Sequence, residues 1–382
     1  MRNFTFYNPT KLIFGTDAMD KIAEQIKPFG QKVLVTYGGG SIKKNGIYEK
    51  VLSQLKGFTV KEFGGIEPNP RVETIRKAIA EFKSWEPDFV LAVGGGSVID
   101  GSKLLISAMY YEGDPWDYMI TPGIEPAKYI PLGTVLTLAA TGSEMNSGAV
   151  ITNWDKNEKL VFGRQQAFPV FSILDPQNTF SVPADQTANG LVDAFSHVLE
   201  QYITTAENVP LQDRFCEGIL MTLIETGTAL LNDLHNYETR ANHMFAATMA
   251  LNNVIRQGTN EDWATHRIEH EISAFYDIPH GAGLAIITPR WMNVIKEQKA
   301  KKIIQYGKRV WGLSGLDEEI IKGAIMKTHD FFKSLGQKMV LSDWGVTDEH
   351  FPEMIERLVA GKIGEIPLNY EQIEAILISS VE

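Results

Sequence analysis

The sequence predicts an α/β domain with a parallel sheet over residues 1–183, followed by an all-α domain over residues 184–382. Three observations predict this division. Short apolar runs alternate with helical patterns in the first half of the chain, which is typical of parallel βαβ units. Beyond Pro183 the apolar residues recur at helical spacing, and β-branched runs become few. Two Gly-Gly-Gly-Ser segments each follow a predicted strand.

Four β-branched runs predict strands of the sheet: Lys32–Tyr37, Phe58–Phe63, Phe89–Val93 and Tyr129–Leu138. Helical patterns occupy Ile42–Leu55, Val72–Phe82 and Val98–Met109. The runs are almost continuously apolar, as expected for strands that are covered on both faces. Ahead of them, Phe4–Tyr7 and Lys11–Phe14 flank an Asn-Pro pair and predict a small hairpin before the sheet.

The second domain is predicted to begin near Pro183, because Pro starts helices well and continues strands badly. Eight helical patterns follow: Leu191–Tyr202, Leu211–Leu231, Tyr237–Asn252, Trp263–Phe275, Lys299–Trp311, Glu318–Leu335, His350–Val359 and Tyr370–Ile378.

The composition excludes several classes of protein. A chain of 382 residues suits two or three domains. A formal net charge of −11 disfavours broad nucleic-acid binding, which needs clustered Lys and Arg. Cys216 is the only cysteine, so the chain can form no internal disulfide and no thiolate-rich metal site. Any metal must therefore be held by His, Asp and Glu.

The location of the protein is also predicted from the sequence. The longest uncharged stretch, residues 129–143, has 15 residues, whereas a spanning helix needs about 20 apolar ones. The first residues show no apolar region typical of a signal peptide. We therefore expect a soluble, cytoplasmic protein that binds neither membrane nor nucleic acid.

The two glycine-rich segments are Gly38, Gly39, Gly40 and Ser41, and Gly94, Gly95, Gly96 and Ser97. Glycines let a ligand approach the backbone, and the free amides of a helix start suit a phosphate. Neither segment is the G-x-G-x-x-G fingerprint, and each could be only a tight strand-to-helix turn. Two such turns after strands of one parallel sheet favour a ligand site at that edge.

Polar residues near these turns extend the candidate site. Asp100 lies in the first turn of the helix after Ser97, where its charge is also simply favourable for the helix. A third turn, Thr137–Glu144, follows another strand and offers hydroxyls and amides at the same edge. It could equally be an ordinary Ser/Thr-rich loop.

Histidines and an aspartate indicate a metal site. Asp193 and His197 stand four residues apart and share one face of a largely apolar helix, where a buried carboxylate needs a partner. An internal Asp–His pair would also meet that need. Further along, His266 and His270 are again four apart, and His280 follows a Pro break. Together these residues suit Zn²⁺ or Fe²⁺. Spacing alone does not choose between His266 and His270.

Eight segments carry a resemblance to a known family: FYNPTKLIFG, YGGGSIKKNG, GGIEPNP, AVGGGSVIDGSK, LTLAATGSEMNSGAVI, GLVDAFSHVLEQY, DWATHRIEHEISAFYDIPHG and LSDWG. Over essentially its whole length the chain resembles the iron-dependent (group III) alcohol dehydrogenases. Within them it resembles the NAD(P)H-dependent butanol dehydrogenase and aldehyde reductase branch. This resemblance implies a Rossmann-like, dehydroquinate synthase-like fold for the first domain.

The resemblance also implies residue roles. It places the metal ligands at Asp193, His197, His266 and His280, and it places His270 beside the metal as a proton carrier. It puts the cofactor pyrophosphate on Gly94–Ser97. The rest of the cofactor is expected near Gly38–Ser41 and Asn69 at the adenosine end, and near Thr137, Leu138, Thr141, Ser143 and Lys159 at the nicotinamide end.

The predicted reaction is reversible hydride transfer between a nicotinamide cofactor and an aldehyde or primary alcohol such as butanol. The metal would act as a Lewis acid, and the cofactor would supply the redox chemistry. His270 would pass the proton to solvent. The alternative for His270 is a group that only orients His266 or the substrate.

Two other functions compete with this prediction. A dehydroquinate synthase-like or glycerol dehydrogenase-like enzyme would use a similar metal and cofactor. The synthase reaction needs basic residues for a phosphorylated, acidic substrate, and only Arg267 lies near the histidines in sequence. The non-enzymatic alternative is a nucleotide-binding regulator, whose structural metal would be closed off by its protein ligands.

Cofactor choice and association are predicted from the N-terminal third. The strand Lys32–Tyr37 runs into Gly38–Ser41 without the carboxylate that usually contacts the ribose hydroxyls of NAD. We therefore expect NADP(H) to be preferred over NAD(H), with Lys43 or Lys44 adding positive charge. The family resemblance also implies a homodimer. We expect it to use residues within Met1–Gly15, because an N-terminal strand could pair across a two-fold axis.

Overall fold

The computed structural model describes residues 1–382, which divide into two compact units. The sheet unit comprises residues 7–182 and 234–244. The helical unit comprises residues 1–6, 183–233 and 245–382. Each unit is therefore discontinuous in sequence. None of the helices combines the length and the apolar character needed to cross a bilayer.

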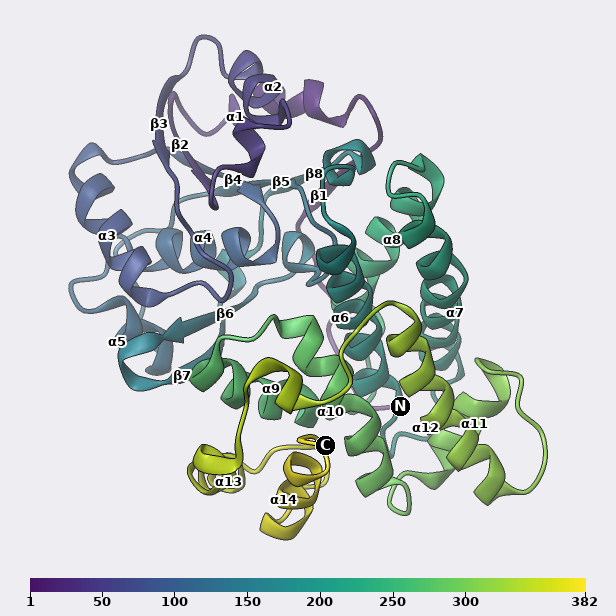
Figure 1. The fold of residues 1–382 in the computed structure, drawn as a ribbon. Coiled ribbons are helices and arrows are strands. Elements are labelled where there is room, and N and C mark those ends of the chain that lie inside the picture. Colours follow the sequence, from purple (N-terminus) through teal and green to yellow (C-terminus); the bar gives the residue numbers. More distant parts are fainter. The chain divides into compact units, whose positions relative to one another are not determined.

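Six parallel strands form the main sheet of the sheet unit, in the order β1-β8-β5-β4-β2-β3 (Figure 1). The strands are β1 (Lys11–Phe14), β2 (Lys32–Tyr37), β3 (Thr59–Phe63), β4 (Phe89–Gly94), β5 (Leu132–Leu136) and β8 (Phe171–Leu174). All residues of β4 and β5 are buried. The predicted parallel α/β sheet is thus confirmed, although β5 is shorter than the predicted run of residues 129–138.

Helices cover the sheet on both faces, which is why its strands are so apolar. The helices of the sheet unit are α1 (Ile22–Ile26), α2 (Ile47–Gln54), α3 (Val72–Phe82), α4 (Gly96–Ala108) and α5 (Pro115–Ile120). Side chains of α1 and α2 form one core with Val33, Val35 and Leu91. On the other face, Thr36 of β2 hydrogen-bonds Ser102 of α4 at 2.7 Å, and α3 packs beside α4.

The hairpin predicted before the sheet is absent. Only the second of its two segments is a strand, and this strand, β1, pairs in parallel with β8, with Lys11 opposite Phe171. The Asn8 side chain accepts from Thr10 N at 3.1 Å and donates to Met145 O at 2.8 Å, so the Asn-Pro turn is tied to the sheet unit. The prediction was wrong because the apolar residues of the first segment, Phe4–Tyr7, pair with no strand.

The sequence analysis also missed a two-stranded antiparallel sheet. It consists of β6 (Gly148–Asn153) and β7 (Glu158–Gly163), joined through Asn157 at a φ of 48°. Its β6 strand packs on α4 and brings Lys159 of β7 into the sheet unit's interior.

The helical unit is built from α6 (Ala184–Tyr202), α7 (Pro210–Asn232), the second part of α8 (Tyr237–Ala250) and all of α9 to α14. The remaining helices are α9 (Ala264–Tyr276), α10 (His280–Ile295), α11 (Ala300–Arg309), α12 (Asp317–Ser334), α13 (Phe351–Ala360) and α14 (Tyr370–Ile378). The buried α6 packs against α7, α9 and α10 (Figure 1). The sequence predicted every helix of this unit except α10, whose early glycines and internal Pro289 weaken its helical pattern.

Candidate functional site

Helix α6 presents a polar stripe inside an apolar core. Asp193, His197 and Glu200 recur at spacings of four and three residues, so they share one face of the helix. All three side chains are buried, with at most 4% of the residue exposed. The apolar residues between them, such as Leu191 and Phe195, are buried on the other faces of α6. Apolar packing therefore holds α6 in place. The buried polar side chains of its stripe need partners that the apolar residues cannot provide.

Helices α9 and α10 bring two histidines to this stripe. His266 lies in the first turn of α9, and His280 is the first residue of α10 after Pro279. A Cβ atom on Gly281 would lie 2.3 Å from the carbonyl oxygen of Asn189 on α6. Only glycine at position 281 lets the start of α10 come this close to α6, which places His280 beside Asp193.

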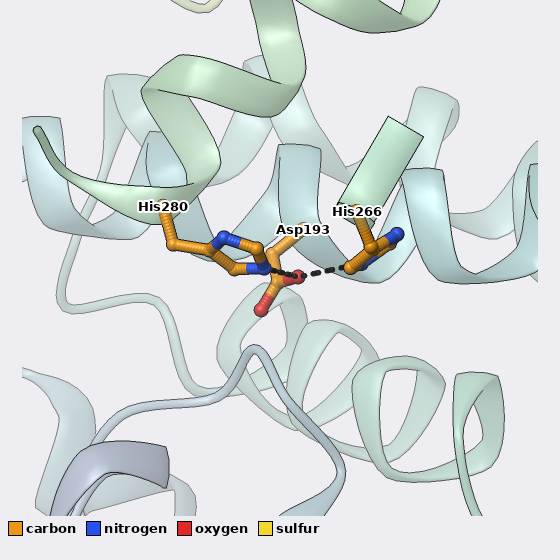
Figure 2. Close-up of side chains that lie close together, drawn as sticks. All are labelled: Asp193, His266 and His280. Carbon is orange, nitrogen blue, oxygen red and sulfur yellow. Dashed lines mark ion pairs between the residues drawn. The ribbon is translucent and has the colours of Figure 1, made fainter. Parts of the chain in front are cut away.

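Three imidazole nitrogens surround one carboxylate oxygen. Asp193 Oδ1 lies 3.5 Å from His197 Nε2, 3.7 Å from His266 Nε2 and 3.6 Å from His280 Nε2. Figure 2 shows the rings of His266 and His280 on either side of the Asp193 carboxylate. Asp193 Oδ1 and His266 Nε2 are buried and make no hydrogen bond.

These separations fit a shared metal ion. They exceed the range of an N–H···O hydrogen bond. Ligand atoms about 2.1 Å from a tetrahedral metal lie about 3.4 Å from one another, close to the observed values. Buried polar atoms without partners are costly, and a cation at their centre would offset that cost. The donor set of one carboxylate and three imidazoles suits Fe²⁺ or Zn²⁺.

The electrostatics of the residues favour the ligand forms of two of them. Burial alone would raise the pKa of Asp193, but His197 and His266 outweigh burial and lower it, so the carboxylate is ionised. Burial lowers the pKa of His197 to about 3, so this ring is neutral at pH 7. For His266 burial acts downward, but the carboxylates of Glu200 and Asp193 prevail and raise its pKa to about 9. A metal binding at His266 must therefore displace a proton.

Two buried glutamates that the sequence analysis missed contact the candidate ligands. Glu200 hydrogen-bonds His266 Nδ1, and Glu269 hydrogen-bonds His280 Nδ1. The signals were present in the sequence, since Glu200 is seven residues after Asp193 on α6 and Glu269 is three residues after His266 on α9. Both positions look like ordinary polar positions of an amphipathic helix.

His270, the predicted proton carrier, lies beside this group. Its ring centre is 5.4 Å from that of His280 and 6.4 Å from that of His266, and it is 4% exposed. Potential ligand atoms of Glu269, His270 and His280 also lie within 4.8 Å of one another. The geometry around Asp193 Oδ1 nevertheless involves His266 and His280 rather than His270.

In the sheet unit, the predicted cofactor-binding turns lie at one edge of the sheet. Gly38–Ser41 follow β2, Gly94–Ser97 span the end of β4 and the start of α4, and residues 137–143 follow β5. Because β2, β4 and β5 are parallel neighbours, their carboxyl ends meet. The third turn is joined to the second by a hydrogen bond from Thr137 N to Gly94 O of 3.1 Å.

The two glycine turns differ in what surrounds them. A Cβ atom on Gly95 would lie 3.0 Å from Leu138, and one on Gly96 would lie 2.4 Å from Thr141. A Cβ atom on Gly39 or Gly40 would have nothing within 4 Å. The second turn is therefore packed by the chain itself, whereas the first faces open space.

Two other predicted cofactor residues are occupied by internal contacts. Ser143 Oγ donates to Asp100 Oδ1 at 2.5 Å, and Asp100 Oδ2 accepts from Val150 N at 2.9 Å. Lys103, one turn after Asp100, is fully buried and donates to Ser143 Oγ at 2.7 Å. This network fixes the third turn on α4. The sequence analysis missed Lys103, which the Asp-x-x-Lys spacing of α4 could have suggested.

The ends of the predicted cofactor site also carry polar contacts. Lys159 Nζ donates to Asn69 Oδ1 at 3.0 Å, which joins β7 to the loop after β3. Lys43 Nζ lies 3.2 Å from Glu62 of β3 and 4.8 Å from the centre of the Tyr37 ring. A carboxylate thus does lie near the first glycine turn, contributed by β3 rather than by β2.

Comparison with known proteins matches both halves of the chain to the same family. The family model "Iron-containing alcohol dehydrogenase" matches residues 9–176, and "Fe-containing alcohol dehydrogenase family, C-terminal" matches residues 187–381. The chain is 48% identical over 388 residues to "Probable NADH-dependent butanol dehydrogenase 1" of Bacillus subtilis, covering 100% of both chains.

Two further matches come from Escherichia coli K12. The chain is 45% identical over 374 residues to "NADPH-dependent aldehyde reductase YqhD", covering 97% of this chain and 96% of the relative. A crystal structure of YqhD superposes with a TM-score of 0.96 at 43% identity, covering 100% of this chain and 99% of that one. Both the sequence segments and the fold are thus shared at full length, and the chain belongs to the iron-containing alcohol dehydrogenase family.

Proposed function

We propose that the protein catalyses reversible hydride transfer between NAD(P)(H) and an aldehyde or primary alcohol. The single observation that carries this proposal is the convergence of three Nε2 atoms on the buried Asp193 Oδ1. Family membership supports it, as do the butanol dehydrogenase and aldehyde reductase names of full-length relatives.

Asp193, His197, His266 and His280 would hold the metal, which we propose to be Fe²⁺ because of the family. A divalent ion there supplies a Lewis acid that polarises a carbonyl oxygen. The carboxylate of Asp193 contributes negative charge, and the neutral His197 contributes a lone pair. Burial of these groups keeps water from weakening the interaction.

His270 is proposed to carry the proton that the carbonyl oxygen gains on reduction. It is held beside the ligand histidines but not at Asp193 Oδ1. Imidazole exchanges protons readily near neutral pH, which suits this role.

The nicotinamide cofactor, which supplies or accepts the hydride, is proposed to lie along the carboxyl edge of the sheet. The second glycine turn opens α4 and would hold the pyrophosphate on its amides. A preference for NADP(H) remains our prediction. The open space at Gly39 supports it, whereas the contact of Lys43 with Glu62 reduces the positive charge available for a 2′-phosphate.

A homodimer through the N-terminal segment is also proposed. Strand β1 lies at the edge of the sheet, so one side of its backbone is unpaired. Phe4, Phe6 and Tyr7, just before it, are 47–59% exposed. A second copy of the strand would satisfy both the backbone edge and the apolar side chains.

One experiment tests the proposed activity. Oxidation of NADPH and of NADH is followed with a panel of straight-chain aldehydes, and bound metal is measured on the same sample. Aldehyde-dependent oxidation with about one Fe²⁺ per chain is expected. Absence of turnover by an iron-loaded sample with every aldehyde would refute the proposal.

A further inference from the structure

The three candidate histidine ligands differ in the hydrogen-bond partner of their Nδ1 atom. His266 and His280 each present Nε2 toward Asp193 and Nδ1 toward a glutamate, Glu200 and Glu269 respectively (Figure 2 shows the two rings). Both glutamates are 0% exposed. A buried carboxylate has a high desolvation cost. Two of them beside one site therefore indicate that their hydrogen bonds to the histidines have a role.

Glu200 is fixed by more than one bond. Besides His266 Nδ1, its carboxylate accepts from Thr265 N at 2.6 Å and from His266 N at 3.3 Å. These amides belong to the first turn of α9, whereas Glu200 belongs to α6. Glu200 therefore sets both the backbone and the ring of His266 relative to Asp193.

Glu269 is held in a similar way. Ser273, one turn further along α9, donates its hydroxyl to Glu269 Oε1. A Cβ atom on Gly283 would lie 2.7 Å from Glu269 Cγ, so α10 leaves room for this side chain only because residue 283 is glycine. The carboxylate thereby reaches His280 on the neighbouring helix.

His197 provides the contrast. Its Nδ1 is buried and has no hydrogen-bond partner. His197 shares α6 with Asp193, so the helix itself fixes the spacing of that pair. The two histidines that come from other helices are the ones that have a carboxylate behind them.

From this pattern we infer that Glu200 and Glu269 are positioning residues of the metal site. Each holds a proton on Nδ1 of its histidine, which leaves the Nε2 lone pair directed at the ion. Such carboxylate–histidine–metal arrangements orient the ring and increase its basicity. The inference rests on the metal site of the proposed function and extends it to two residues that touch neither substrate nor ion.

The test measures metal affinity rather than turnover. Co²⁺ serves as a spectroscopic probe, and its dissociation constant is measured by competition with a chromophoric chelator for wild type, Glu200→Gln, Glu269→Gln, Glu269→Ala and His280→Ala. Glu217→Gln is the matched control, because Glu217 is a buried glutamate of the same unit that accepts from Tyr202 Oη at 2.8 Å and Arg309 Nη1 at 2.8 Å. Far-UV circular dichroism of the metal-free samples checks folding.

We expect Glu200→Gln and Glu269→Gln each to bind Co²⁺ about 10- to 100-fold more weakly than wild type, with a shifted visible spectrum. Glu269→Ala should lose more than Glu269→Gln, since the amide oxygen can still accept from Nδ1. Glu217→Gln should match wild type in affinity. If Glu200→Gln does not fold, the Glu269 pair tests the inference alone.

Three results would overturn the inference. Affinities of Glu200→Gln and Glu269→Gln equal to wild type would show that the carboxylates do not support the ligands. A loss in Glu269→Gln as large as in His280→Ala would make Glu269 a ligand itself. No Co²⁺ or Fe²⁺ binding by wild type would overturn the metal site of the proposed function and the inference with it.

Discussion

The candidate sites of the helical unit and the sheet unit differ in whether their polar side chains have hydrogen-bond partners. At the candidate metal site of the helical unit, buried polar atoms such as Asp193 Oδ1 and His266 Nε2 lack hydrogen-bond partners. At the candidate cofactor edge of the sheet unit, Ser143 hydrogen-bonds both Asp100 and Lys103, and the open space lies over Gly39 and Gly40. The candidate metal site is thus recognised by buried side-chain atoms without hydrogen-bond partners, whereas the first glycine turn is recognised by open space beside its backbone.

The largest expected effect is the loss of metal affinity when one of the proposed ligand side chains is removed. His280→Ala should weaken metal binding by at least about 1000-fold, because a ligand is lost and Asp193 is left with fewer partners. His270→Ala should keep the metal but lose activity. Metal content after gel filtration checks both variants. Full metal in His280→Ala together with an empty His270→Ala would show that His270 is the ligand.

The contrast between packed and open glycines gives the next effect. Gly96→Ala should lower the free energy of unfolding by about 2–3 kcal/mol, because its Cβ would meet Thr141. Gly39→Ala should change it by less than about 0.5 kcal/mol, because its Cβ meets nothing. Urea unfolding of both variants measures the difference. Equal losses would mean that the first turn is as closely packed as the second.

A pH response of the metal-free protein should arise in the helical unit. The folded state holds a proton on His266, whose pKa is raised to about 9, whereas the unfolded state releases it near pH 6.5. The stability from this proton is complete below pH 6.5 and is lost as the pH rises. Between pH 6.5 and 8 the loss should be about 2 kcal/mol.

Denaturant unfolding of chelator-treated protein at both pH values checks this response. His266→Gln should flatten it. In the sheet unit, burial lowers the pKa of Lys103 to about 8. Its titration therefore increases the free energy of unfolding as the pH rises, but mainly above pH 8. A rise in stability between pH 6.5 and 8 would contradict the assignment to His266.

The smallest expected effect concerns cofactor choice at the open turn. Gly39→Asp should lower kcat/KM for NADPH about tenfold more than for NADH, because a carboxylate there repels a 2′-phosphate. Steady-state kinetics with both cofactors measures the ratio. A wild-type enzyme that already prefers NADH would show that Glu62, by holding Lys43, outweighs the missing carboxylate on β2.

The sequence predicted what depends on periodicity and spacing. The apolar runs predicted β2 to β5. The four-residue spacings predicted that Asp193 shares a helix face with His197, and His266 with His270, whereas the choice of His266 as a ligand came from the family resemblance. It failed where long-range packing decides. The pairing of β1 with β8 depends on residues about 160 positions away in the chain. Glu200 and Glu269 become distinctive only once α6, α9 and α10 are packed together.

The interleaving of the two units along the chain has a consequence for biosynthesis. The sheet unit includes residues 234–244, so it cannot be completed when residue 182 leaves the ribosome. At about 5–20 residues per second, the missing segment follows several seconds later, after all of α7 has been made. A gene truncated after Pro183 would therefore encode every strand of the sheet but not residues 234–244 of the sheet unit. Growing chains must likewise wait for α10 before the last of the four proposed ligands exists.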